Sequence, residues 1–109
     1  MLRPVKFDVT NHPSCVDAIE LVRSEMTTKS LPFVALVNNA GVSRRFLAEF
    51  QDLNDARKLF ETNFFGMVDL TQLSLPLIRQ STGRVLMISS VSGLRGQTNI
   101  SFAQNLARL

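Results

Sequence analysis

The segment at 33–42 constrains the fold of this chain more than any other stretch. A continuous apolar run at 33–37 is followed at once by the sequence Asn-Asn-Ala-Gly at 38–41. That pattern is typical of a buried parallel strand that ends in a loop exposing its backbone. In open α/β sheets, ligands bind at the carboxyl ends of the strands. The segment therefore predicts a parallel sheet with a dinucleotide site at that edge.

The remaining patterns supply the elements that a parallel sheet needs. Residues 5–9 alternate and predict a short strand, and a helix at about 13–28 follows from apolar residues at helical spacing. A long helix is predicted at about 54–79 and a further strand at 84–88. Parallel strands require such crossover helices. The order predicts an α/β fold: a partial, Rossmann-like doubly wound parallel sheet of three strands, with residues 1–109 as one incomplete domain.

Composition excludes several functional classes. The 12 basic residues are scattered, the net charge is only +3, and Trp and Tyr are absent, so no nucleic-acid partner is expected. The single cysteine, Cys15, predicts an intracellular, reducing compartment and a small packed helix residue. His12 is isolated, so no metal site is expected. No apolar run is long enough to span a membrane.

Two predicted strand ends carry candidate binding residues. At Asp8, a carboxylate could accept from a ligand amine or cap the helix that follows. Asn38 could line a ligand loop or satisfy the backbone of a plain turn. Gly41 permits either a positive φ or a close backbone approach.

Two further polar residues stand out beside apolar sequence. Asn63 lies within the long predicted helix, either facing solvent or buried with a specific hydrogen-bond partner. Ser90 follows the last predicted strand, where a hydroxyl can reach a substrate.

These motifs, taken in order, resemble the short-chain dehydrogenase/reductase family. The matching stretches are Phe-Asp-Val-Thr at 7–10, Asn-Asn-Ala-Gly at 38–41, Asn-Phe-Phe-Gly at 63–66 and the strand ending in Ser-Ser at 83–90. The resemblance covers about 6–93, with 94–109 as a divergent tail. The residue sequences at 75–79 and 90–93 resemble those of the retinol, hydroxysteroid and hydroxybutyrate dehydrogenase branch of the family.

The resemblance implies a role for each matching residue. Asp8 would meet the adenine amine of NAD or NADP, with the Val9 backbone beside it. The ribose side of the cofactor would be lined by Asn38, Ala40 and Gly41. Asn63 would hold a water in a proton relay, and Ser90 would orient the substrate carbonyl or hydroxyl.

The chain also departs from the family pattern. The family's glycine-rich phosphate loop, with its first two strands, should precede Lys6 and is not found in the sequence. The family's Tyr-x-x-x-Lys would fall at Ala103 and Ala107, and the chain contains no tyrosine. Turnover by these 109 residues alone is therefore not expected. In the doubly wound order, the missing strands lie between residues 5–9 and the Asn38 strand, so only the Asn38 and Ser90 strands would be neighbours.

The resemblance implies a fragment of an NAD(P)-dependent oxidoreductase that interconverts an alcohol and a ketone or aldehyde. Its substrate would be small and apolar, of retinoid, steroid or hydroxy-acid type, and a full-length parent could be cytoplasmic or membrane-associated. The alternative is a non-catalytic truncated product that associates with full-length relatives, or with a second copy, through the helix at 54–79.

Overall fold

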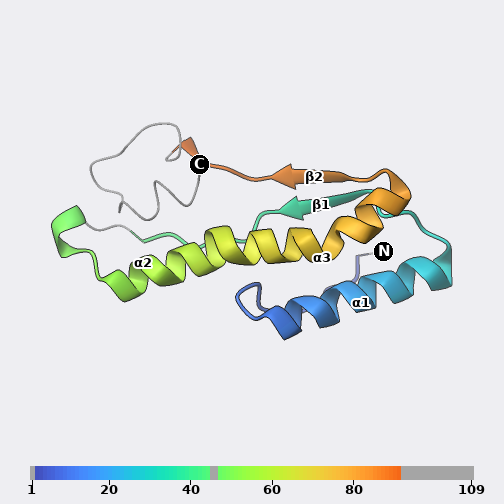
Figure 1. Cartoon of the computed structure of the whole chain (residues 1–109), viewed down its shortest axis with the longest axis horizontal. Coiled ribbons are helices and arrows are strands. Elements are labelled where there is room, and N and C mark those ends of the chain that lie inside the picture. Colours follow the sequence, from blue (N-terminus) through green and yellow to red (C-terminus); the bar gives the residue numbers. More distant parts are fainter. Residues whose placement is uncertain (1, 45–46, 92–109) are drawn as a thin grey trace.

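The computed structural model describes residues 2–44 and 47–91. It is an α/β arrangement in which two parallel strands, β1 (Ala35–Asn38) and β2 (Arg84–Met87), lie side by side over two helices (Figure 1). The prediction that the Asn38 and Ser90 strands are neighbours is confirmed, in the register Ala35 opposite Arg84. The predicted tail at 94–109, with Ala103 and Ala107, lies outside the described residues.

The first helix begins where the sequence provides a cap. α1 (His12–Lys29) starts after Asn11, whose side chain accepts from the Ser14 amide at 3.0 Å, and Pro13 fits its first turn. It ends at Ser30, which adopts a left-handed conformation with φ 50°. The helix predicted at 13–28 is thus confirmed to within one residue at each end.

The long predicted helix is present but is not uniform. It comprises α2 (Leu53–Phe60), a π-helical turn η2 (Glu61–Phe65) and α3 (Gly66–Ser81), which follow one another along the long axis of the molecule (Figure 1). Asp52 caps α2 by accepting from the amides of Asn54 and Asp55. The loop before α2 holds one short 3₁₀ turn, η1 (Ala48–Phe50).

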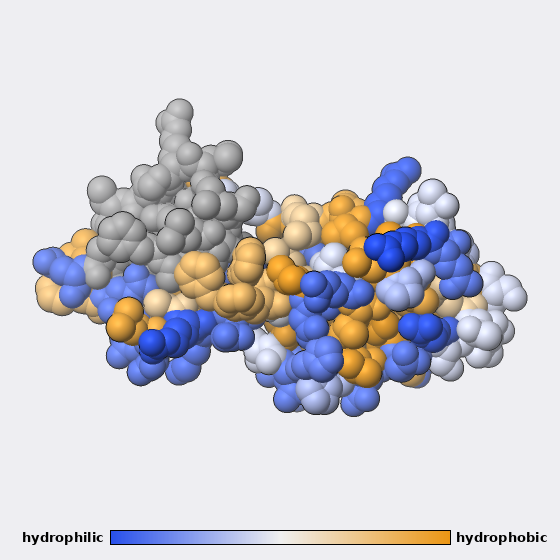
Figure 2. Space-filling view, viewed as in Figure 1, coloured by the Kyte–Doolittle hydropathy of each residue, from blue (hydrophilic) through white to orange (hydrophobic). Residues whose placement is uncertain are grey.

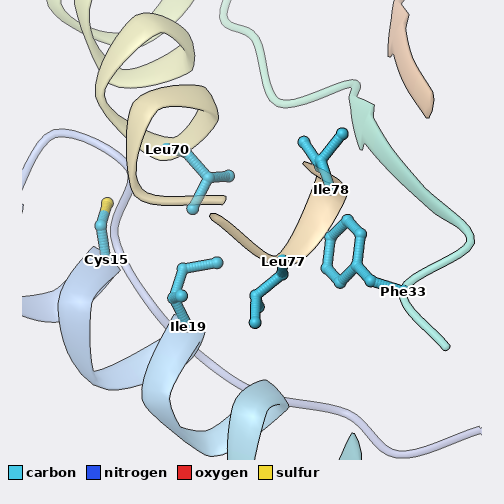
Figure 3. Packing of buried hydrophobic residues seen from close by; sticks show 6 residues of the cluster. All are labelled: Cys15, Ile19, Phe33, Leu70, Leu77 and Ile78. Atoms are coloured by element: carbon cyan, nitrogen blue, oxygen red, sulfur yellow. The ribbon is translucent and has the colours of Figure 1, made fainter. Parts of the chain in front are cut away.

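The core lies between α1 and α3. Ile19 of α1 lies opposite Leu70 and Leu77 of α3, and Cys15, Phe33 and Ile78 belong to the same buried cluster (Figure 3). Cys15 is completely buried, as expected for a small packed helix residue. Burial raises the pKa of its thiol, and the carboxylates of Asp69 and Asp8 raise it further, which favours the protonated form.

The strand predicted at 5–9 is wrong, because this segment forms no strand in the structure. The sheet therefore has two strands rather than three. The physical reason is that alternation fixes which side chains share a face, whereas a strand also needs a neighbour for its ladder hydrogen bonds. Among the described residues, the only strands are β1 and β2, and they pair with each other rather than with this segment.

The molecule is elongated for its length. Its extents are 52 × 25 × 24 Å and its radius of gyration is 16.1 Å, against about 13 Å for a compact domain of this size. Apolar side chains of the two strands and their flanks are exposed, among them Val34, Val37, Leu86 and Ile88. Figure 2 shows hydrophobic side chains reaching the surface between hydrophilic ones on the face it displays. Within the described residues, the two strands are therefore not covered on both faces as a parallel sheet usually is.

Candidate functional site

Asp8 shapes the turn that precedes α1. Its Oδ1 accepts from the Thr10 amide at 2.9 Å and from the Thr10 hydroxyl at 2.8 Å. These two bonds, the amide first, hold the pKa of the Asp8 carboxyl below its ordinary value, so the group is an exposed, ionised acceptor. The alternative that Asp8 caps the following helix is wrong, because Asn11 occupies that position.

Asn38 joins three elements through its side chain and backbone. The side chain is buried, and its Nδ2 donates to Thr71 Oγ1 of α3 at 2.8 Å and to Met87 Sδ of β2 at 3.2 Å. The Asn38 carbonyl accepts from the Ile88 amide at 3.0 Å. Asn38 therefore fixes the end of β1, while the neighbouring Asn39, Ala40 and Gly41 are exposed. No described glycine has a positive φ, so Gly41 does not use that freedom here.

Asn63 clamps the loop that follows β1. Its Oδ1 accepts from the Val42 amide at 2.8 Å, and its Nδ2 donates to the Val42 carbonyl at 2.9 Å. The side chain is only 6% exposed, so the alternative that it faces solvent is wrong and the prediction of a specific partner is confirmed. Asn63 lies in η2, and single π-helical turns of this kind occur frequently at functional sites.

Gly66 allows the helix to pass close to the Asp8 turn. A Cβ at this position would lie 2.5 Å from the Val9 carbonyl oxygen, which no real contact permits. Because glycine has no side chain, the start of α3 can pack directly against the backbone of Val9. In the sequence, Gly66 stands out only as the last residue of the motif at 63–66, and no pattern indicates that it would pack against the backbone of Val9.

The Asp8 turn, the loop after β1 and the long helix converge on one cavity. Its volume is about 610 Å³. It is lined by Asp8, Thr10, Val42, Arg44, Asp55, Lys58, Leu59, Glu61 and Thr62. A smaller hollow of about 90 Å³ lies between Phe7 and Val9 on one side and the end of β1 on the other. Two candidate binding segments separated by about 30 residues in the sequence thus border one region.

Ser90 lies at the same sheet edge. The bond from the Ile88 amide to the Asn38 carbonyl keeps the chain beyond β2 beside the chain beyond β1. Ser90 is half-buried but does not line the large cavity. The structure therefore brings Asp8, Val9 and the Asn38 loop together and places Ser90 at the neighbouring strand end.

Sequence reasoning missed two contributors to this site. Val42 receives the Asn63 clamp through its backbone, which no side-chain pattern reveals. Thr71, on the buried side of the long helix, accepts from Asn38 through its hydroxyl and donates to the Met67 carbonyl at 2.7 Å. A threonine on a buried stripe is the one signal that could have indicated a polar partner.

In 2–44 and 47–91, no group of three or more His, Cys, Asp or Glu side chains is arranged to hold a metal ion. Within the same residues, no helix has both the length and the apolar character needed to cross a bilayer.

Comparison with known proteins decides the family. The model of the short chain dehydrogenase family matches residues 1–102. The chain belongs to the short-chain dehydrogenase family. It is 37% identical over 92 residues to rat D-beta-hydroxybutyrate dehydrogenase and 36% identical over 92 residues to mouse retinol dehydrogenase 7. Each match covers 84% of this chain but only 27% and 28% of the relative, so the chain spans about a quarter of their length.

A solved structure of this family agrees with the fold. The gluconate 5-dehydrogenase from Burkholderia cenocepacia, crystallised with NADP and tartrate, superposes with a TM-score of 0.77 at 25% identity. The superposition covers 94% of this chain and 38% of that enzyme. The relatives named above include members of the hydroxybutyrate and retinol dehydrogenase branch, as the motifs at 75–79 and 90–93 suggested.

Proposed function

We propose that this chain contributes to an NAD(P)-dependent oxidoreductase that interconverts an alcohol and a ketone or aldehyde. The observation that carries the proposal is the convergence of the Asp8 turn, the Asn63-clamped loop and the cavity of about 610 Å³ at the carboxyl end of β1. The relatives' names support a substrate of hydroxy-acid or retinoid type. We include steroids in the proposed substrate class, alongside hydroxy acids and retinoids.

The binding residues have distinct tasks in this proposal. Asp8, as an ionised acceptor, takes a hydrogen bond from the adenine amine, with the Val9 backbone beside it. The exposed Ala40 and Gly41 and the end of β1 at Asn38 line the ribose side. When bound, the nicotinamide cofactor supplies or accepts the hydride.

The catalytic residues hold the substrate and a proton path. Ser90 donates to or accepts from the substrate oxygen, and Asn63 holds a water of the proton relay. The Asn63 side chain already uses its oxygen and one N–H on Val42, so its part in the relay falls to its backbone or its second N–H. The chain has no tyrosine to act as the proton donor, and general acid catalysis requires a positioned donor. We therefore expect no turnover from these 109 residues alone.

A chimera tests the proposal directly. Residues 6–91 of this chain would replace the matching segment of rat D-beta-hydroxybutyrate dehydrogenase, which retains its own remaining sequence. We expect NAD⁺-dependent oxidation of hydroxybutyrate by the chimera. Ser90→Ala in the chimera should lower kcat by about 10²–10³, as expected when one donor to a reacting oxygen is lost.

Ser89→Ala is the matched control, because it removes the neighbouring hydroxyl from the same strand end. It should leave kcat within a few-fold of the parent chimera. A folded, cofactor-binding chimera without turnover would contradict the proposal, as would equal losses for the two serine variants.

A second candidate function is association with a full-length relative without catalysis. The exposed side chains of Phe64, Phe65 and Val68 on η2 and α3 favour it, because such apolar groups are typical of contact surfaces. Co-purification of the tagged chain with a full-length relative, compared with its Phe65→Glu variant, tests this candidate. Equal recovery of both would exclude association through this helix.

A further inference from the structure

Ser14, in the first turn of α1, reaches back to the Asp8 turn. Its Oγ accepts from the Asp8 amide at 3.0 Å, and its own amide donates to Asn11 Oδ1 at 3.0 Å. In a capping box, the side chain of the third helical residue bonds to the amide of the capping residue. Here the amide of the capping residue Asn11 donates to the Asp8 carbonyl at 3.1 Å instead. The Ser14 hydroxyl therefore holds the turn rather than the end of the helix.

Both backbone groups of Asp8 are bonded to the start of α1. The amide donates to Ser14, and the carbonyl accepts from the Asn11 amide and, at 3.6 Å, from Cys15 Sγ. Because each peptide unit is planar, the first bond fixes the plane before Asp8 and the other two fix the plane after it. The direction in which the Asp8 side chain leaves the backbone depends on both planes, and Ser14 holds the first of them.

Ser14 itself does not face the proposed cofactor site. It is half-buried and lines neither of the two cavities that border the Asp8 turn, whereas Asp8 is exposed and lines the cavity of about 610 Å³. Thr10 donates twice to Asp8 Oδ1. A carboxylate has about four acceptor positions, so Asp8 can accept from a further donor. An effect of Ser14 on a ligand in this cavity must therefore pass through Asp8.

We propose that Ser14 is a positioning residue for adenine recognition, whose hydroxyl fixes the Asp8 backbone so that the carboxylate is aimed at the adenine amine. This role rests on the adenine contact of the proposed function and adds to it a residue outside the motif at 7–10. Hydrogen bonds weaken steeply when their geometry is lost. Removing the Ser14 hydroxyl should therefore reduce selectivity for the amine, rather than weaken every cofactor equally.

Two reduced cofactors serve as probes in a binding titration of the chimera, followed by fluorescence without turnover. One is NADH, and the other is its hypoxanthine analogue, in which a carbonyl oxygen replaces the adenine amine and cannot donate to Asp8. We expect the parent chimera to bind NADH more tightly than the analogue. Ser14→Ala should reduce this preference by about three- to tenfold, which is the range for the loss of one aligned hydrogen bond.

Two further variants separate positioning from a general effect on the fold. Ser14→Thr keeps the hydroxyl and should retain most of the preference. Ser24→Ala makes the same change at an exposed position of the same helix and should leave both dissociation constants unchanged. Equal weakening of both cofactors in Ser14→Ala would indicate a merely structural role and overturn the proposal.

A double variant tests whether Ser14 acts through Asp8. Asp8→Ala should abolish the preference for NADH. Adding Ser14→Ala to it should change the preference no further, because residues in one network have non-additive effects. Additive effects of the two substitutions would show that Ser14 acts independently of Asp8, which would contradict the proposal.

Hydrogen exchange at the Asp8 amide gives a readout that needs no cofactor. In the parent chimera this amide should exchange about tenfold more slowly than in Ser14→Ala, because only the parent has the Ser14 acceptor. Exchange of the parent amide at the rate of an unbonded group would overturn the proposal even if Ser14→Ala did not fold. Equal binding of NADH and the analogue by the parent chimera would overturn the adenine contact of the proposed function as well. A preference that survives Ser14→Ala would overturn the role of Ser14 alone.

Discussion

The clamp between Asn63 and Val42 predicts a loss of stability whose size depends on pH. In Asn63→Asp, one carboxylate oxygen can still accept from the Val42 amide. The other oxygen, however, then faces the Val42 carbonyl, to which Asn63 Nδ2 donates at 2.9 Å. One hydrogen bond is lost and a buried acceptor is left unpaired, which costs about 1–3 kcal/mol. With the repulsion between the two oxygens added, we expect a loss at the upper end of this range, about 3 kcal/mol, at neutral pH.

Protonation of the introduced carboxyl restores the missing donor. Its pKa in the folded state is therefore raised above the unfolded value. Since 1.36 kcal/mol corresponds to one pKa unit, a loss of about 3 kcal/mol corresponds to a rise of about two units. The sign follows from linkage: the deficit is complete above the raised pKa and shrinks as the pH falls toward the ordinary aspartate value.

Chemical denaturation of the chimera from pH 4 to pH 8 measures this deficit against the parent chimera. Asn54→Asp is the control, because Asn54 is exposed in the first turn of α2. A negative charge there should change stability by no more than about 0.3–1 kcal/mol, and in the stabilising direction. If Asn63→Asp matches the parent at neutral pH, or if its deficit does not change with pH, the clamp does not stabilise the loop as inferred.

Three further changes test neighbouring features. Alanine normally favours a helix over glycine by about 1 kcal/mol. Gly66→Ala should nevertheless destabilise the chimera by about 1–3 kcal/mol, because the added Cβ would meet the Val9 carbonyl oxygen at 2.5 Å. A higher denaturation midpoint for this variant would contradict the contact. Thr10→Val removes the hydroxyl but keeps the amide that lowers the pKa of Asp8, so NMR titration of the carboxyl carbon should show a partial rise. The stabilising contribution of Asp8, present above the ordinary aspartate pKa, should then be lost at a higher pH than in the parent. Thr82 adopts φ 53° at the end of α3, so Thr82→Gly should stabilise by about 0.5–1 kcal/mol, and a lower midpoint would refute strain there.

The sequence predicts those parts of the fold that depend on local pattern. The helix at α1, the long helix and the two paired strands are confirmed because each pattern acts over a few neighbouring residues. The π-helical turn at Glu61–Phe65 could not be predicted. An α-helix and a π-helical turn can have the same residue composition and the same spacing of apolar residues, so the sequence pattern does not distinguish them.

For the site, the sequence could predict which residues have a role but not which groups they contact. A buried amide at Asn63 implied a specific partner, but the partner is a backbone group of Val42, which carries no signal in the sequence. Likewise, Asp8 was a plausible cap by position, and only the geometry shows Asn11 in that role. Side-chain chemistry identified which residues have a task, whereas the identity of each partner required the fold.

The contrast between residues 5–9 and β1 shows why the wrong prediction concerned a strand. Both segments carry the side-chain pattern of a strand, but β1 has β2 beside it, and the segment at 5–9 has no neighbour among the described residues. Helices satisfy their own backbone groups, so α1 and the long helix form wherever their pattern occurs. A strand depends on hydrogen bonds from elsewhere in the sequence. The alternation at 5–9 fixes which side chains share a face but supplies no hydrogen-bond partner, so this segment stays outside the sheet while β1 and β2 complete each other.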